Sequence, residues 1–199
     1  MLDLREKRAW IFDLDGTLTQ PVHDFELIRQ KLGIDPSDDI LDCIKRQSPE
    51  RQRWMNAELD ILEREYASQA APAEGVLDCL EALAAADCQM GILTRNTHEL
   101  ALLSLKAIGA DAFFQKAHVL GREDSQPKPS PEGIHILLKQ WELPSHSGVM
   151  VGDFHLDLLS GRAAGVSTVH VDVKDRHWPE DTDIRVKNLP ELTSLLTLA

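Results

Sequence analysis

A chain of 199 residues, 43% of them hydrophobic and 27% charged, can bury the core of one globular domain and still carry an insert. Its net charge of −12 argues against a surface for nucleic acid or an anionic membrane, because like charges repel. Three cysteines without a CxxC spacing argue against a disulfide framework or a zinc site. No apolar run approaches membrane-spanning length. We therefore expect a cytoplasmic protein, and its oligomeric state stays open.

The first expected element is a buried strand, the apolar run Trp10 to Phe12, which stops at Asp13 and Asp15. Residues i and i+2 of a strand share a face, so these two carboxylates could occupy one small volume. They would repel each other unless a cation or a shared proton lies between them. The ordinary alternative is a strand that ends in an Asp-Gly turn.

Residues 20–72 show helical spacing of apolar residues and no convincing strand. Ser48-Pro49-Glu50 has the pattern of a helix start, and the segment ends at Ala70-Ala71-Pro72. We expect residues 1–19 and 73–199 to form a core domain, and residues 20–72 to form a helical cap that closes over the site marked by Asp13. Alternatively, these helices belong to the main core.

From Glu74 onward, strands and helices alternate. The expected helices cover residues 76–83, the segment after Thr97, the segment opened by Ser130-Pro131-Glu132, and residues 156–164. The expected strands cover residues 90–93, 148–151, 168–171 and 184–186, with 113–114 and 117–120 as short extended candidates. This alternation predicts an α/β fold, a Rossmann-like and mostly parallel sheet with helices on both faces.

Three of the expected strands end in polar residues, and ligands of parallel sheets bind beyond those ends. The polar groups are Asp13 and Asp15, then Thr94-Arg95-Asn96, then Gly152-Asp153 with Asp157 nearby. Carboxylates suit Mg²⁺, whereas a hydroxyl and free amides before a helix suit a phosphate. Lys128, ahead of another helix start, adds a cation. Each signal alone has an ordinary explanation, such as a helix cap or a solvated lysine, but the order of all four is difficult to assign to chance.

Taken in order, these motifs resemble those of the haloacid dehalogenase superfamily, specifically its phosphatase-like members with a small helical cap, such as phosphoglycolate phosphatases. The matching segments are Asp13-Leu14-Asp15-Gly16-Thr17-Leu18, Thr94, Lys128-Pro129 with Pro131-Glu132, and Gly152-Asp153-x-x-x-Asp157. The resemblance covers nearly the whole chain apart from the cap.

The resemblance implies a phosphoric monoester hydrolase that uses Mg²⁺ and acts on a small phosphorylated metabolite through an aspartyl-phosphate. Asp13 would be the nucleophile, and Asp15 would be the general acid and base. The phosphoryl group would be held by Thr94, Arg95, Asn96 and the catalytic Lys128. Mg²⁺ would be held by Asp13, the backbone carbonyl of Asp15, and Asp153, while Asp157 would orient Lys128 or a metal-bound water.

The chain departs from the family pattern in several places. Phe154-His155 stand where relatives have a small hydroxyl residue, and Gly161 replaces the usual alanine. The basic residues of the cap could bind an anionic tail of the substrate or form a solvated helix face: Arg46, Arg51 and Arg53. Two alternatives to a phosphatase stay open, namely a phosphomutase that reuses the aspartyl-phosphate and a weakly catalytic phosphate sensor.

Overall fold

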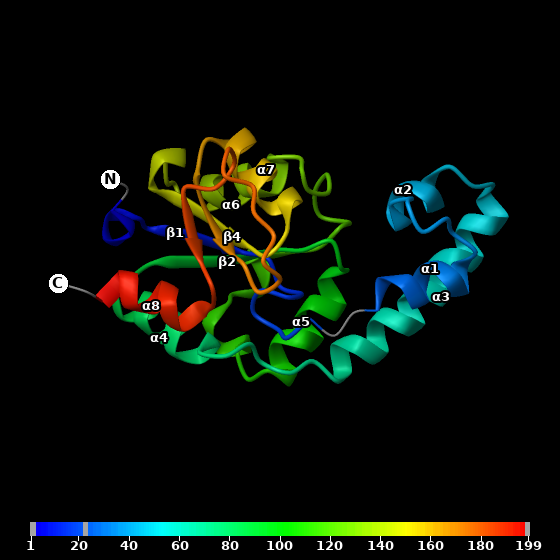
Figure 1. The fold of residues 1–199 in the computed structure, drawn as a ribbon, viewed down its shortest axis with the longest axis horizontal. Helices are drawn as coiled ribbons and strands as arrows, with labels where there is room; N and C mark the ends of the chain where they lie inside the picture. The colour runs from blue at the N-terminus through cyan, green and yellow to red at the C-terminus, as the bar shows by residue number, and fades with distance from the viewer. Residues whose placement is uncertain (1–2, 22–23, 198–199) are drawn as a thin grey trace.

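The computed structural model describes residues 3–21 and 24–197, and its centre is a six-stranded sheet (Figure 1). The strands are β1 (Ala9–Phe12), β2 (Gln89–Leu93), β3 (Val119–Leu120), β4 (Gly148–Gly152), β5 (Ser167–Val171) and β6 (Ile184–Val186). Their order in the sheet is β3-β2-β1-β4-β5-β6, and every neighbouring pair is parallel. The predicted α/β fold with a parallel sheet is thereby confirmed.

Successive side chains of β1 point to opposite faces of the sheet, as the two-residue period of a strand requires. Trp10 and Phe12 join the core formed with α4 (Val76–Ala85), α5 (His98–Ala107) and α8 (Leu189–Thr197). Ala9 and Ile11 join the core formed with α6 (Glu132–Gln140) and α7 (His155–Ala164). Figure 1 shows these two helix sets on opposite sides of the strands. Both faces of β1 are therefore fully buried, which explains its uninterrupted apolar sequence.

Three helices form an insert between β1 and α4: α1 (Phe25–Leu32), α2 (Ile40–Lys45) and α3 (Pro49–Ser68). They bury an apolar cluster of their own, to which Ile28, Leu32, Met55 and Leu59 contribute. Ser48 caps α3 as expected, because its side chain accepts a hydrogen bond from the backbone N–H of Arg51. Figure 1 shows the insert projecting to one side of the sheet, with α3 returning toward α5.

The two connections between the insert and the sheet run side by side. Thr19 and Pro72 form an isolated antiparallel bridge, and the backbone N–H of Gln20 donates to the carbonyl of Ala71 over 2.9 Å. This pairing lies at the ends of the predicted cap segment. The predicted domain ranges also include residues 1–2, 22–23 and 198–199, which lie outside the described residues.

The two short extended segments expected at residues 113–114 and 117–120 were wrong in part. Residues 111–113 form a 3₁₀ turn, and so do residues 116–118, which leaves Phe114 extended and only Val119–Leu120 in the sheet. Phe113 and Phe114 pack against the core of α4, α5 and α8 instead of pairing with a strand. Helix α8, which buries Leu189 and Leu192, was not among the elements expected from the sequence. Within the described residues, no helix is long and apolar enough to cross a membrane.

Candidate active site

A buried lysine between two buried carboxylates lies at the centre of the candidate site. Lys128 Nζ is 2.5 Å from Asp13 Oδ1 and 2.6 Å from Asp157 Oδ1. All three residues are buried, and Asp157 is only 2% exposed. Burial by itself would lower the pKa of Lys128, but the two carboxylates outweigh it and raise that pKa, so the lysine stays cationic.

The sheet register brings these groups together from distant parts of the chain. Phe12 is aligned with Ile92 of β2 and with Val151 of β4, so the residues that follow the three strands meet at one edge. The backbone N–H of Asp13 donates to the carbonyl of Val151 over 2.9 Å, which holds the aspartate against β4. The predicted gathering of polar strand ends is therefore present in the structure.

Two glycines allow the close approach of these loops. Gly16 has a φ of +93°, a conformation that side chains rarely adopt, and a Cβ there would lie 2.9 Å from Asp153 Oδ2. A Cβ on Gly152 would lie 2.3 Å from the Cβ of Asp157. Larger residues at these positions would push Asp153 away from the Asp13 loop, or Asp157 away from Lys128.

Three carboxylates of the site are close enough to share one cation. Oxygens of Asp13, Asp153 and Asp157 lie within 4.8 Å of one another. Burial, followed by the charges of the other two aspartates, raises the pKa of Asp153 to about 7. Burial likewise raises the pKa of Asp157 to about 6, although Lys128 opposes that shift. A cluster of hard oxygen donors with too little positive charge fits Mg²⁺.

The loop after β2 contributes the polar groups expected to bind a phosphoryl group. Thr94 and Asn96 are buried, and the backbone N–H of Asn96 donates to Thr94 Oγ1 over 3.1 Å. Thr94 Oγ1 also lies 3.5 Å from Asp15 Oδ2, which brings Asp15 to the same edge. Thr17, which is not among the expected site residues, donates from its Oγ1 to Asp13 Oδ2 over 3.3 Å.

Arg95, expected to bind the phosphoryl group, is instead bound to a carboxylate of the insert. Its Nη2 lies 2.8 and 2.7 Å from the two carboxylate oxygens of Asp39, the N-cap residue of α2. A second pair of this kind joins Arg122, which follows β3, to Glu63 of α3. The sequence carries no signal for either pair, because the partners are 56 and 59 residues apart.

Of the three basic residues considered in the cap, two are tied within the insert. Arg46 pairs with Asp38 over 3.3 Å. Arg51 donates to the carbonyl of Leu32 and lies over the ring of Trp54, with the guanidinium carbon 4.3 Å from the ring centroid. Arg53 is exposed. These contacts favour the solvated helix face over an anion site.

Phe154 and His155, which depart from the family pattern, are both held by contacts with neighbouring residues. The backbone N–H of Phe154 donates to Asp157 Oδ2 over 3.1 Å, so this carboxylate receives hydrogen bonds from both sides. The Phe154 side chain is 43% exposed and packs edge-on against Trp178, while His155 stacks on the same indole and bonds Asp181 over 2.8 Å. The aromatic pair therefore packs against the loop that carries Trp178.

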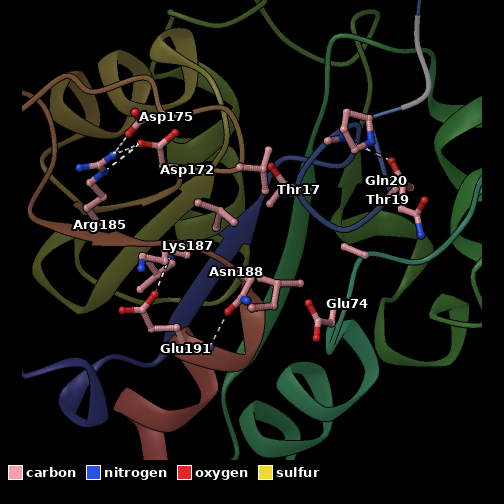
Figure 2. A pocket seen from close by; sticks show the side chains of 17 residues that line it. Thr17, Thr19, Gln20, Glu74, Asp172, Asp175, Arg185, Lys187, Asn188 and Glu191 are labelled. Atoms are coloured by element: carbon pink, nitrogen blue, oxygen red, sulfur yellow. Dashed lines mark hydrogen bonds and ion pairs between the residues drawn. The ribbon is translucent and has the colours of Figure 1, made fainter.

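A cavity of about 800 Å³ is lined in part by Gly16 and Thr17, residues of the loop that follows Asp13 and Asp15 (Figure 2). Thr17, Thr19 and Gln20 line one side, while Asp172 and Arg185 belong to the opposite side near the ends of β5 and β6. Neither Asp13, Lys128 nor Asp153 lines this cavity. We place the candidate active site at the carboxylates and the lysine, because the chemistry of a site depends on its reactive groups rather than on the room beside them.

The sequence matches the haloacid dehalogenase-like hydrolase family over residues 26–171. The chain therefore belongs to this family and is an enzyme of the hydrolase class, which confirms both the predicted resemblance and the predicted class. A haloacid dehalogenase-like hydrolase domain-containing protein of Arabidopsis thaliana is 30% identical over 95% of this chain and 83% of its own length. Pyrophosphatase PpaX of Listeria innocua is 30% identical over 81% of each chain.

Solved structures share the fold at lower sequence identity. A hydrolase from Pseudomonas syringae has a TM-score of 0.80 at 19% identity, over 96% of this chain and 98% of its own. CbbY from Rhodobacter sphaeroides, solved in complex with phosphate, has a TM-score of 0.74 at 19% identity, over 96% of this chain and all of its own. At such identities the likeness establishes the architecture, insert included, and not the substrate.

Proposed function

We propose that this hydrolase is a Mg²⁺-dependent phosphatase that releases phosphate from a small phosphorylated metabolite through an aspartyl-phosphate. The observation that carries the proposal is the buried contact of Lys128 with both Asp13 and Asp157, next to Asp153. A phosphatase of this kind needs an anionic nucleophile beside fixed positive charge, and this cluster supplies both.

Asp13 is the proposed nucleophile. Its Oδ1 faces Lys128 and its Oδ2 faces the hydroxyl of Thr17, so both oxygens are oriented by neighbours. In the first step one Asp13 oxygen bonds to phosphorus while the bond from phosphorus to the ester oxygen breaks. The buried lysine offsets the charge of the transferred group, which is the role that preorganised cations fill in phosphoryl transfer.

Asp15 is the proposed general acid and base. It gives a proton to the leaving oxygen, then takes one from the water that attacks the aspartyl-phosphate, so that free phosphate leaves and Asp13 is regenerated. Thr94, which lies 3.5 Å from Asp15, and the neighbouring Asn96 would hold the oxygens of the phosphoryl group together with Lys128. Asp157 keeps Lys128 in place, which agrees with the orienting role implied by the family resemblance.

The fitting metal is Mg²⁺, which Asp13, Asp153 and the backbone carbonyl of Asp15 would hold. When bound, it supplies a Lewis acid that offsets negative charge on the phosphoryl oxygens. The raised pKa of Asp153 supports this assignment, because a divalent cation would stabilise the charged carboxylate that burial and the neighbouring aspartates disfavour. The name of the relative PpaX supports a phosphate-releasing activity and adds pyrophosphate to the candidate substrates.

The test is a screen of phosphorylated metabolites for phosphate release, with Mg²⁺ and with EDTA. We expect at least one phosphate ester or pyrophosphate to be hydrolysed only when Mg²⁺ is present. Transfer of the phosphoryl group to a second hydroxyl of a sugar, without free phosphate, would favour the phosphomutase alternative. Binding of phosphorylated ligands without any turnover would favour the sensor.

A further inference from the structure

Two arginines at the rim of the candidate site are each held by a carboxylate of the insert. Arg95 follows β2 and binds both oxygens of Asp39, while Arg122 follows β3 and binds both oxygens of Glu63 over 2.9 Å each. The two strands are neighbours in the sheet, so both arginines come from the same sector of its carboxyl edge. The insert therefore supplies anions to two cations of the sheet domain.

The Arg122 pair lies next to the residues proposed to hold the phosphoryl group. The backbone N–H of Arg122 donates to the carbonyl of Asn96 over 2.9 Å, which fixes Arg122 to the loop that begins at Thr94. Glu63 lies near enough to the general acid that the charge of Asp15 contributes to raising the pKa of Glu63. A substrate whose phosphoryl group binds at Thr94 would thus lie close to the Arg122–Glu63 pair.

Neither arginine–carboxylate pair is fully satisfied. Glu63 is 12% exposed and Arg122 is 17% exposed, and burial raises the pKa of Glu63 to about 7 despite the arginine beside it. Both Glu63 oxygens share one nitrogen of Arg122, its Nη1. Arg95 has a buried Nε without a hydrogen-bond partner within the described residues. A buried donor left unpaired costs free energy that an anionic ligand would recover.

We propose that Arg122, together with Arg95, binds an anionic leaving group of the substrate, and that Glu63 and Asp39 occupy these arginines in its absence. The inference rests on the proposed phosphatase function and names its substrate class: compounds with a second phosphate or a carboxylate beyond the phosphoryl group. A protein of net charge −12 needs dedicated cations to hold such a dianion near Asp13 and Asp15. Arginine suits the task because its planar fork matches carboxylate and phosphate oxygens.

The test compares Arg122→Gln with Glu63→Gln on three substrates under saturating Mg²⁺. Pyrophosphate carries a second phosphate, phosphoglycolate carries a carboxylate, and 4-nitrophenyl phosphate carries no anionic group beyond its phosphoryl group. We expect Arg122→Gln to raise KM for at least one of the two anionic substrates by roughly 10- to 100-fold, the loss typical of a hydrogen bond to a charged group. For 4-nitrophenyl phosphate we expect KM to stay within about threefold.

Glu63→Gln distinguishes a binding site from a structural ion pair, because it frees Arg122 while keeping the shape of the side chain. We expect it to lower KM for the same anionic substrate by about threefold or more, the opposite direction to Arg122→Gln. Whichever of pyrophosphate and phosphoglycolate responds identifies the second anion. If the two variants instead impair all three substrates to the same extent, the pair is a structural contact and the proposal is wrong.

A second readout is independent of turnover. In EDTA, pyrophosphate or phosphoglycolate should raise the melting temperature of Glu63→Gln more than that of the wild type, and that of Arg122→Gln least. If Arg122→Gln does not fold, the double variant Glu63→Gln with Arg122→Gln, which buries no unpaired charge, takes its place. Equal shifts in the presence and absence of Arg122 would contradict the proposal.

The exposed pair of Arg64 with Glu99 is the matched control, because it also joins α3 to the sheet domain but is well exposed to solvent. Glu99→Gln should leave the ratio of KM values among the three substrates unchanged. No hydrolysis of any of them, together with no Mg²⁺-dependent activity in the wider screen, would overturn the proposed function. Hydrolysis of 4-nitrophenyl phosphate without discrimination by Arg122 would overturn only this inference.

Discussion

The charge of Lys128 is the residue-scale feature on which the proposed chemistry depends. A lysine as buried as this one would lose its proton more easily without a partner, because burial disfavours the charged form. The carboxylates of Asp13 and Asp157 lie within 2.6 Å of its Nζ and raise its pKa instead. Its positive charge therefore persists across the whole pH range in which a phosphatase works.

Replacing Lys128 with glutamine should lower kcat for any hydrolysed substrate by about 10²–10³-fold, the loss typical when a charge-stabilising donor is removed. Lys7→Gln is the matched control. Lys7 is also buried, but it precedes β1 at the opposite edge of the sheet, where its Nζ donates to the carbonyl of His146. Lys7→Gln should lower the melting temperature and leave kcat within about threefold; equal losses of kcat would contradict the placement of the site.

The two aspartates of the first motif should fail in different ways. Asp13→Asn removes the attacking oxygen, so neither turnover nor a phosphorylated protein should form. Asp15→Asn removes proton transfer, which typically costs about 10²–10⁴-fold, and it should slow hydrolysis of the intermediate more than its formation from an aryl phosphate. Mass spectrometry after an acid quench should then detect phosphate on Asp13 in the Asp15 variant. A phosphate trapped on any other residue would contradict the assigned roles.

At the scale of single elements, α7 shows that helix propensity alone does not determine which residue occupies each position. Gly161 lies inside this helix, where alanine would be favoured by about 1 kcal/mol on propensity alone. A Cβ at Gly161 would, however, lie 2.7 Å from Thr168 Cγ2 and 3.0 Å from Met150 Cβ. The glycine thus lets α7 pack close against β4 and β5, the strands that carry these two residues.

We expect Gly161→Ala to lower the free energy of unfolding by about 1–2 kcal/mol, because overpacking of a buried contact outweighs the gain in propensity. Ala163→Gly, at an exposed position of the same helix, should lower it by up to about 1 kcal/mol through propensity alone. Urea denaturation followed by circular dichroism measures both. A more stable Gly161→Ala protein would show that α7 can shift away from the sheet at little cost.

At the scale of the whole molecule, the buried carboxylates of the site lower the stability of the metal-free protein, and a bound metal would offset this effect. Without metal, the pKa of Asp153 is raised to about 7 and that of Asp157 to about 6, mainly through burial. A carboxyl group with a raised pKa stabilises the fold when protonated, and that stability is lost as the pH rises from its unfolded pKa to its folded pKa. The contribution of these two groups to the free energy of unfolding of the metal-free protein therefore falls as the pH rises from about 4 to about 7.

Mg²⁺ should consequently raise the melting temperature more at pH 7.5 than at pH 5.0, since at pH 5.0 it must displace protons from the same carboxylates. Differential scanning calorimetry at both pH values, with Mg²⁺ and with EDTA, measures the effect. Asp153→Asn should abolish most of the gain at pH 7.5. A gain that is equal at both pH values, or one that survives in Asp153→Asn, would contradict this metal site.

The sequence alone was enough to predict the class of architecture and the residues of the candidate site. Strand and helix periods are local properties, so the order of the strands and helices predicted a parallel sheet with helices on both faces. Parallel strands end at one edge, and for that reason Asp13, Thr94 and Asp153 could be expected to meet. The spacing of Asp157 after Asp153 on a helix start likewise placed its carboxylate near the same edge.

Tertiary structure alone decided which charges meet across the chain. Asp39 is the N-cap residue of α2 and Glu63 lies within α3, and no local pattern shows which cation either carboxylate would meet. Their partners Arg95 and Arg122 are more than fifty residues away, so the pairing depends on how the insert docks onto the sheet. The same holds for Gly161, whose role depends on the distance to Thr168 across a packed interface, and that distance is not encoded in the period of either element.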